Sequence, residues 1–143
     1  MAAAYSKDQV ERYLVYIQFP ERLRDAPRDL TFLTTLHAHQ ISRIPYDNLS
    51  LHYSKSHRNS LDPQVIYDKF THNGRGGYCM ETAVFYKYML RALGFRTYIA
   101  GARIRLREDN VPHGDFISWY AIRIIVTPYL YVKGSSYIQG STV

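Results

Sequence analysis

Apolar residues repeat at helical intervals near the start of the chain. They stand at Val10, Tyr13, Leu14 and Ile17. Ser6 precedes them, with Gln9 three residues later, which is the spacing of a capping box, and Pro20 follows them. The pattern therefore predicts a first helix that begins after Ser6 and ends before Pro20.

Two further helices are predicted before the middle of the chain. The second begins near Asp29 and ends before Ile44-Pro45, because a residue that precedes proline is disfavoured in the helical conformation. One side of it carries Leu30, Leu33, Leu36 and His37. The third helix is shorter and covers Asp62–Phe70, with Asp62 at the N-cap and Pro63 at the first helical position.

A glycine-rich loop leads into a fourth helix. Three glycines in four positions, Gly74-Arg75-Gly76-Gly77, predict unusual backbone angles. Met80 to Leu93 are strong helix formers with apolar residues at helical spacing, and Gly94 stands where a C-cap glycine belongs.

After Gly94 the pattern changes to that of strands. We expect strands over 96–104, 119–126 and 129–132, a polar loop over 107–114, and a weakly patterned tail over 134–143. Helices first and strands later indicate an α+β fold. The expected organisation is a helical domain with a loop–helix site over 1–94, and strands with a divergent tail over 95–143.

Composition narrows the class of protein. The 143 residues are 46% hydrophobic and 21% charged, as is typical of one globular domain. No apolar run approaches the ~20 residues of a membrane span, and the N-terminus turns polar too early for a signal peptide. We therefore expect a cytoplasmic protein without a membrane partner. The one cysteine, Cys79, excludes an internal disulfide and a multi-cysteine zinc site, so no metal is expected.

The charge points to small anions rather than to nucleic acid. Eighteen Lys and Arg against 12 Asp and Glu give a formal charge of +6, but the basic residues are scattered and form no run. We expect no nucleic-acid partner, and favour an anionic cosubstrate such as a nucleotide or coenzyme A. Arg103, Arg105 and Arg107 alternate on one face of an extended segment, which is either solvated or in contact with phosphates.

Cys79 is the candidate nucleophile. A lone cysteine is often only a small buried hydrophobe, but this one follows the glycine-rich loop and opens a helix. The positive end of the helix and its free backbone N–H groups would stabilise a thiolate, and the same amides would stabilise an oxyanion on an acyl group. The arrangement therefore indicates an acyl-transferring cysteine.

Other candidate motifs have simpler interpretations. Arg75-Gly76-Gly77 is a single copy rather than an RGG repeat of an RNA-binding segment. His37 and His39 are two residues apart on a predicted helix and do not share a face, which disfavours a metal site. His52, His57 and His72 have no partner pattern and are predicted to lie at the surface.

Two motifs resemble the arylamine N-acetyltransferase family. The stretch Arg75-Gly76-Gly77-Tyr78-Cys79-Met80-Glu81, with Leu93-Gly94-Phe95 after it, is similar to the active-site signature of that family. Upstream, Ile44-Pro45-Tyr46-Asp47-Asn48-Leu49 resembles its I-P-F-E-N-L element. The resemblance runs from about Tyr13 to Arg103 and extends toward Trp119.

The resemblance implies a fold and a mechanism. The fold is a helical bundle followed by part of a β-barrel, an incomplete form of the cysteine-proteinase-like transferase fold. Cys79 would take an acetyl group from acetyl-CoA, or an acyl group from another acyl-CoA, and pass it to an arylamine or hydrazine. No bound cofactor is expected, and no coenzyme-binding residues are assigned. Arg75 would pair with Asp47, and Gly76, Gly77 and Glu81 would support the site.

The chain departs from the family pattern beyond Trp119. By resemblance, a histidine and an aspartate should follow there, yet no His occurs after His113 and no Asp or Glu after Asp115. His113 is the remaining candidate for the base. A changed reading frame, a retained intron or a premature stop would each produce such a tail. Three alternatives therefore stay open: a xenobiotic-metabolising acetyltransferase, a truncated, inactive member that self-associates through unpaired barrel strands, or a cysteine hydrolase of the same broad superfold. The sequence does not define the acceptor amine, the acyl preference or the oligomeric state.

Overall fold

The fold combines helices in the first two thirds of the chain with strands after them. The computed structural model describes residues 4–55, 57–104, 107–108, 111–112 and 117–127. The helices are α1 (Lys7–Tyr16), η1 (Glu21–Leu23), α2 (Leu30–Arg43), α3 (Leu49–Tyr53), α4 (Pro63–Tyr67), η2 (Asp68–His72) and α5 (Cys79–Ala92). The strands are β1 (Arg96–Ile104), β2 (Arg107–Glu108), β3 (Val111–Pro112) and β4 (Ile117–Thr127).

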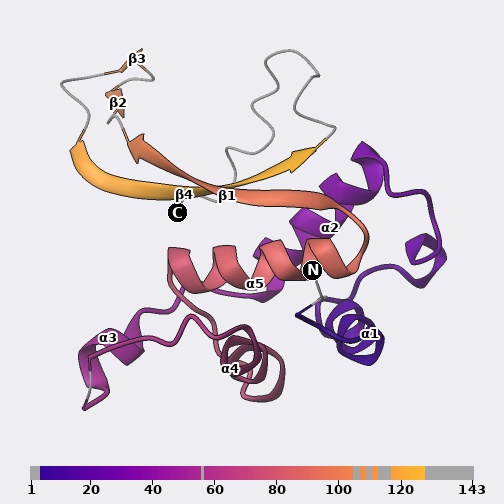
Figure 1. Ribbon diagram of the computed structural model, residues 1–143, viewed down its shortest axis with the longest axis horizontal. Helices are drawn as coiled ribbons and strands as arrows, with labels where there is room; N and C mark the ends of the chain where they lie inside the picture. Colours follow the sequence, from indigo (N-terminus) through magenta and orange to yellow (C-terminus); the bar gives the residue numbers. More distant parts are fainter. Residues whose placement is uncertain (1–3, 56, 105–106, 109–110, 113–116, 128–143) are drawn as a thin grey trace.

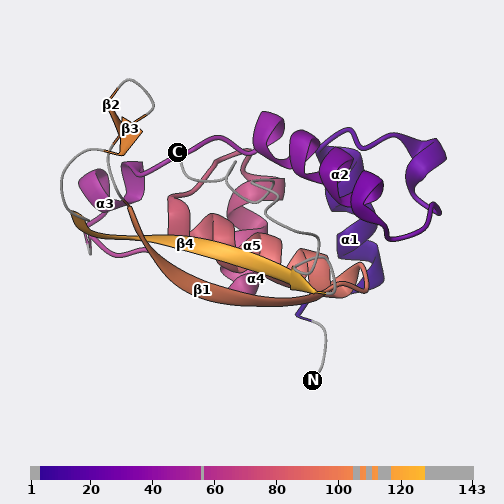
Figure 2. The same cartoon turned by 90° about the horizontal axis from the view of Figure 1, so that it is seen from above.

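Helix α5 lies at the centre of the arrangement. The long pair of strands β1 and β4 runs along one side of it, while α1 and α2 lie toward the end of α5 that leads into β1 (Figures 1 and 2). Helices α3 and α4 lie toward the opposite end, where α5 begins. The start of α5, and with it Cys79, therefore lies toward α3 and α4.

The sequence patterns place the helix starts well. The Ser6 hydroxyl accepts the N–H of Gln9 at 3.2 Å, and the Gln9 side chain accepts the N–H of Ser6 at 2.9 Å, so the predicted capping box is confirmed. The Asp29 carboxylate caps α2 through the N–H of Phe32, and the Asp62 carboxylate caps α4, whose first residue is Pro63. Short side-chain acceptors thus fix three of the helix starts.

The buried face of α2 is centred on Phe32 and Leu36. The buried residues are Phe32, Leu36 and Gln40, whereas Leu30 is 41% exposed. Leu36 is buried as predicted. Phe32 faces the core because its ring packs between those of Phe19 and Phe95, at centroid distances of 5.0 and 6.0 Å.

Helix α4 continues further than its pattern predicts. It passes directly into η2, a π-helical turn in which the N–H of Asn73 donates to the carbonyl of Asp68, five residues earlier. This wide turn carries Lys69 and the fully buried Phe70 to the underside of the glycine-rich loop. The predicted helix over Asp62–Phe70 therefore exists but is extended to His72, because η2 has no distinctive sequence period.

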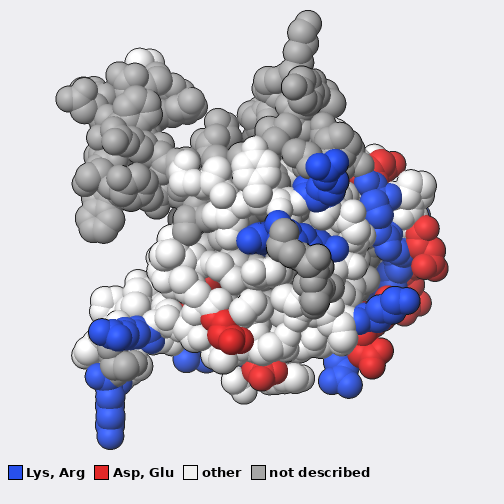
Figure 3. Space-filling view, viewed as in Figure 1, with Lys and Arg blue, Asp and Glu red and all other residues white. Residues whose placement is uncertain are grey.

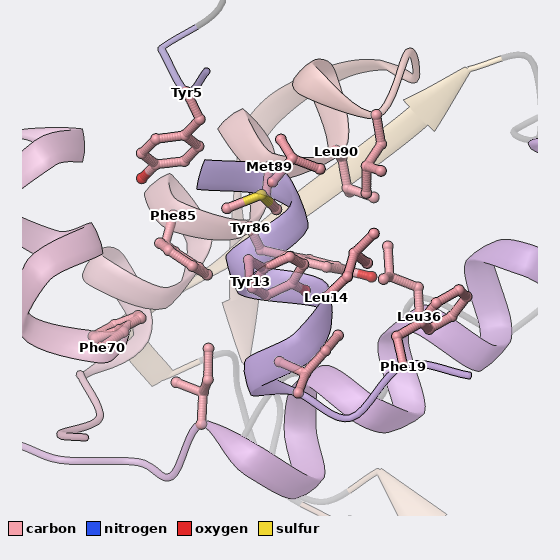
Figure 4. Close-up of a cluster of buried hydrophobic side chains, with 14 of the residues drawn as sticks. Tyr5, Tyr13, Leu14, Phe19, Leu36, Phe70, Phe85, Tyr86, Met89 and Leu90 are labelled. Carbon is pink, nitrogen blue, oxygen red and sulfur yellow. The ribbon is translucent and has the colours of Figure 1, made fainter. Parts of the chain in front are cut away.

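The core is an aromatic cluster around Phe85 of α5 (Figure 4). The Phe85 ring lies 5.0 Å from that of Phe70, 5.5 Å from Tyr13 and 5.7 Å from Tyr5. Two of the buried tyrosines also use their hydroxyls, since Tyr13 donates to the side chain of Gln40 at 2.7 Å and Tyr5 to the backbone carbonyl of Pro63 at 2.9 Å. The first helix, the η2 turn and α5 are therefore joined through one side chain.

The two long strands form an antiparallel pair that is fastened to α5. Their register runs from Arg96↔Thr127 to Arg103↔Tyr120, with an irregularity between Arg103 and Ile104. The Arg91 guanidinium of α5 donates twice to the carbonyl of Thr97, at 2.7 and 3.1 Å. Thr97 and Val126 are buried against the helices. The strand predicted over 96–104 is confirmed, and the one over 119–126 is confirmed with longer bounds.

The mixture of helices and strands agrees with the α+β prediction. Within the described residues the sheets are the pairs β1–β4 and β2–β3, and the latter lies inside the segment predicted as a polar loop. The helical bundle, the β-barrel and the division at residue 94 remain predictions. The predicted strand over 129–132 and the tail over 134–143 lie outside the described residues. Across the part of the chain that the structure describes, no helix has the length and apolarity to cross a membrane.

Candidate functional site

The loop that precedes Cys79 is held by backbone contacts with the upstream motif. Tyr46 and Gly77 form a parallel β-bridge. The N–H of Asp47 donates to the carbonyl of Gly77 at 3.1 Å, and the N–H of Gly77 donates to the carbonyl of Pro45 at 3.3 Å. Two motifs that are about thirty residues apart in sequence are therefore locked side by side.

Two glycines are required because this approach is so close. A Cβ atom at Gly76 would lie 1.8 Å from the carbonyl oxygen of Pro45. A Cβ atom at Gly77 would lie 2.7 Å from the Phe70 ring and 2.9 Å from Oε2 of Glu81. Gly74 has a different reason: its φ is +62°, with open space around it. The structure thus gives each glycine of the motif a physical role in shaping the loop.

Arg75 and Asp47 form an ion pair on the outer side of the loop. Nε and Nη2 of Arg75 donate to Oδ2 of Asp47 at 3.0 and 2.8 Å, and Nη2 also donates to the Ser50 hydroxyl at 3.3 Å. The side chain of Asp47 is 10% exposed and that of Arg75 is 41% exposed. The structure therefore brings together the pair that the resemblance implies.

The environment of Asp47 favours its charged form. Burial alone would raise the pKa of the carboxyl, but the N–H of Leu49, which donates to it at 2.8 Å, and the Arg75 guanidinium lower it. The net effect holds the pKa of Asp47 below its ordinary value. Asp47 is therefore an anion at neutral pH, and its pair with Arg75 is a permanent part of the loop.

Lys69 and Glu81 form a second ion pair on the inner side of the loop. Nζ of Lys69 lies 2.8 Å from Oε1 and 3.0 Å from Oε2 of Glu81. The side chains are 13% and 3% exposed. Oε2 of Glu81 also accepts the backbone N–H of Tyr78 at 3.2 Å. This carboxylate therefore joins the η2 turn, the loop and the first turn of α5.

Cys79 is the first residue of α5 and is half-buried with a free thiol. The residue before it, Tyr78, has extended backbone angles, so the chain changes direction just ahead of the sulfur. The Thr82 hydroxyl donates to the carbonyls of Tyr78 and Cys79, both at 3.1 Å, which fastens the first turn. The first N–H groups of a helix and its dipole favour negative charge at this position.

The phenol of Tyr78 stays neutral next to this site. Its pKa is raised, first because the ring is partly desolvated and then because the charges of Glu81 and Cys79 disfavour a second anion. Tyr78 can therefore donate a hydrogen bond from its hydroxyl at neutral pH, but it does not supply a base.

The described histidines all lie in other surroundings. His39 and His57 donate from Nδ1 to the carbonyls of Ile17 and Leu51, and His72 pairs with Asp68 at 2.9 Å. His37 packs against the Tyr86 ring, and burial lowers its pKa. His52, His57 and His72 are exposed, as predicted. Among the described residues, no histidine bonds to the Cys79 sulfur, while His113 and Asp115 lie outside the described residues.

Charges of both signs lie next to one another on the surface. On the face shown in Figure 3, basic and acidic residues are interspersed along one side, and further basic and acidic residues lie near the middle, separated by uncharged surface. Within the part of the chain that is described, no cluster of three or more His, Cys, Asp or Glu side chains is placed to hold a metal ion. The site is therefore built from ion pairs and backbone contacts around a single thiol.

Two members of the site have no local signal in the sequence. Lys69, the partner of Glu81, stands twelve residues before it in a segment read as ordinary helix, and Ser50 lies in a helix, α3, that the pattern does not predict. The β-bridge of Tyr46 with Gly77 is equally a tertiary contact. The nearest available signal for Lys69 is its place in the segment that resembles the family.

A family model described as N-acetyltransferase matches residues 29–119, which include the whole site. Among curated proteins, the chain is 31% identical over 129 residues to the liver isozyme of arylamine N-acetyltransferase from Gallus gallus, covering 90% of this chain and 41% of that protein. It is 30% identical over 120 residues to the N-malonyltransferase FDB2 of Fusarium pseudograminearum, covering 76% of this chain and 35% of that protein. The chain thus spans about two fifths or less of the length of these relatives.

Solved structures give the same fold. The arylamine N-acetyltransferase of Mycobacterium abscessus superposes with a TM-score of 0.65 at 24% identity, over 82% of this chain and 38% of that one. The enzyme of M. smegmatis superposes with a TM-score of 0.59 at 27% identity, over 83% and 42%. The chain belongs to the arylamine N-acetyltransferase family.

Proposed function

We propose that the chain transfers an acetyl group from acetyl-CoA, or another acyl group from another acyl-CoA, to the nitrogen of an aromatic amine or hydrazine through Cys79. The observation that carries this proposal is the position of the thiol. Cys79 opens α5 directly after a loop that Asp47, Arg75 and Glu81 hold from two sides. Family membership supplies the reaction class, since the relatives are named as acetyl- and malonyltransferases that act on nitrogen.

The transfer takes place in two steps. The Cys79 thiolate attacks the thioester carbonyl, a bond forms between the cysteine sulfur and the acyl carbon, and the coenzyme thiolate leaves and takes up a proton. The amine nitrogen then attacks the new thioester, the nitrogen–carbon bond forms, the nitrogen loses a proton, and the Cys79 thiolate is released. Backbone N–H groups at the start of α5 are suited to stabilise the oxyanion in both steps.

The ligands of the proposed function are small molecules. The acyl-CoA is a cosubstrate rather than a bound cofactor, and its phosphates are the anions that a basic chain of formal charge +6 would attract. The acyl group is left open because relatives carry both acetyl and malonyl in their names. Nucleic acid and membrane are not among the proposed partners, and the proposed location is the cytoplasm, where xenobiotic amines would be the acceptors.

A second candidate is a non-catalytic family member. It is favoured by the position of the described histidines, none of which bonds to the Cys79 sulfur. Triad enzymes that lose their general base lose orders of magnitude in rate. Within the described residues, the pair β1–β4 carries no third strand on either edge, and such edges promote self-association. This candidate predicts concentration-dependent association without transfer.

An acceptor assay separates the two candidates. Purified protein is incubated with acetyl-CoA and aniline, and the N-acetylated product is quantified against a Cys79→Ala control of matched folding. Product that requires both acetyl-CoA and Cys79 supports the transferase. Product formation equal in the wild type and the variant would reject it and leave the non-catalytic candidate.

A further inference from the structure

The buried pair Lys69–Glu81 lies directly beneath the start of α5. Its two side chains come from different elements, η2 and α5, and bury their charges at the point where the glycine-rich loop crosses them. A buried ion pair costs desolvation free energy, so its presence is weak evidence for a role in stability alone. The contacts of its members indicate what else the pair does.

Glu81 determines where α5 begins. Its Oε2 accepts the N–H of Tyr78, the residue immediately before Cys79, at 3.2 Å. The same oxygen would be 2.9 Å from a Cβ atom at Gly77. The carboxylate is therefore enclosed between the loop and the first turn of the helix, and any shift of Glu81 moves the backbone that carries the thiol.

Lys69 connects this carboxylate with the outer ion pair. Its carbonyl accepts the N–H of Arg75 at 3.1 Å, and its ammonium contributes to lowering the pKa of Asp47. The charged groups around the loop are thus two cations and two anions: Asp47 and Arg75 on the outer side, Lys69 and Glu81 on the inner side. The titratable phenol of Tyr78 faces the inner anion. These four charges form two ion pairs, one on each side of the loop.

We propose that Lys69 and Glu81 are positioning residues for Cys79, which fix the first turn of α5 and balance their own charges beside the thiol. The inference rests on the proposed role of Cys79 as the nucleophile. Glu81 supplies the geometry through the N–H of Tyr78. Lys69 neutralises the carboxylate of Glu81, which stands two residues after Cys79 in the first turn of α5.

This role predicts opposite effects for the removal of each charge. Glu81→Gln keeps an oxygen that can accept the N–H of Tyr78 but leaves the Lys69 cation uncancelled, which favours the thiolate. Lys69→Met leaves the Glu81 anion uncancelled, which disfavours it. A pair that only stabilised the fold would shift the reactivity of the thiol in one direction, or not at all.

Alkylation of Cys79 by iodoacetamide measures this directly, because the chain holds one cysteine. Intact mass gives the alkylation rate of the full-length chain over a pH series. At a pH on the rising part of the profile, Glu81→Gln should react roughly threefold faster than wild type and Lys69→Met roughly threefold slower. Glu21→Gln and Lys7→Met, which change exposed charges outside α5, are the controls and should match wild type.

Folded variants that shift in the same direction, or that match the exposed controls, would overturn the proposal. If Lys69→Met does not fold, the neutral double variant Lys69→Met/Glu81→Gln replaces it, and Glu81→Gln should still react faster than the double variant because only the Lys69 charge differs. Alkylation needs no acyl-CoA. Opposite shifts without aniline acetylation would therefore reject the proposed function while supporting the positioning role. Aniline acetylation without opposite shifts would support the proposed function and reject the positioning role.

Discussion

The loop before Cys79 and the histidines of the chain differ in how closely they are tied to the sulfur. Pro45, Asp47, Lys69 and Glu81 hold the loop through backbone contacts and two ion pairs. Of the described histidines, His39 and His57 instead bond to backbone carbonyls, and His72 bonds to Asp68. The loop that carries the Cys79 thiol is thus held by contacts among residues 45–81, whereas none of the described histidines bonds to the sulfur.

This difference separates the contacts that place the thiol from the supply of a base. The direct contacts of the loop and of the helix start all lie within about forty residues of sequence. Variants that remove the contacts of the loop with Pro45, or one partner of either ion pair, should show how firmly these contacts fix it.

The largest effect is expected at Gly76. A methyl group there would lie 1.8 Å from the Pro45 carbonyl oxygen, so Gly76→Ala has to displace the bridge between the two motifs. We expect a loss of on the order of 4 kcal/mol in unfolding free energy, measured by urea denaturation. Gly74→Ala is the matched control, because its φ of +62° is strained but its surroundings are open. It should lose only about 1 kcal/mol. Equal losses would show that the loop is not held against Pro45.

The inner ion pair should matter more to stability than the outer one. Lys69→Met leaves a carboxylate that is only 3% exposed without its cation, at an expected cost of about 3 kcal/mol. Arg75→Met should cost about 1 kcal/mol, because the Arg75 side chain is 41% exposed and water can replace part of its contact. Unfolding in urea at neutral pH compares the two variants. A larger loss for Arg75→Met would reverse this ranking of the two sides of the loop.

Asp47 should make stability depend on pH in the acidic range. Its pKa is held below the ordinary value of about 4, so the folded state releases this proton more readily than the unfolded state. The contribution is therefore complete above that ordinary value and is lost as the pH falls through the folded value. Thermal unfolding of Asp47→Asn should show a lower Tm at neutral pH and a smaller decrease below about pH 4. An unchanged acid profile would mean that Arg75 does not hold this carboxylate.

The smallest effect is expected at His37, which lies between α2 and α5. Burial lowers the pKa of its ring, so the unfolded state takes up the proton first as the pH falls. Stability should therefore decline below about pH 6.5, and His37→Phe should flatten this part of the curve. His72→Gln, which removes an exposed histidine, is the control and should leave the decline in place. The same decline in both variants would assign it to another group.

The sequence predicts helix starts well because the signals are local. Ser6, Asp29 and Asp62 each cap a helix with a side chain that is within three residues of the N–H it accepts. The strand that starts at Arg96 follows directly from the change of period after Gly94. The buried side of α2 has no such local signal, because the burial of Phe32 rather than Leu30 depends on rings from two other segments.

The site was predictable only in part, because some of its members are brought together by contacts between segments that are distant in sequence. Cys79, Arg75 and the glycines stand in one motif, and the resemblance linked them to Asp47. The role of Lys69 could not be predicted, because the π-helical turn that carries it beneath the loop has no sequence period of its own. The candidate base, His113, lies outside the described residues, so its role remains a prediction.

The most direct test of the central claim is the covalent half-reaction. Full-length protein is mixed with acetyl-CoA, and its intact mass is followed with time, with Cys79→Ala as the control and a thermal melt to verify that both are folded. Presentation of the thiol by the loop predicts one acetyl adduct per chain, absent in the variant and removed by hydroxylamine, as a thioester is. A folded wild-type protein that forms no adduct, or forms it equally without Cys79, would contradict the account.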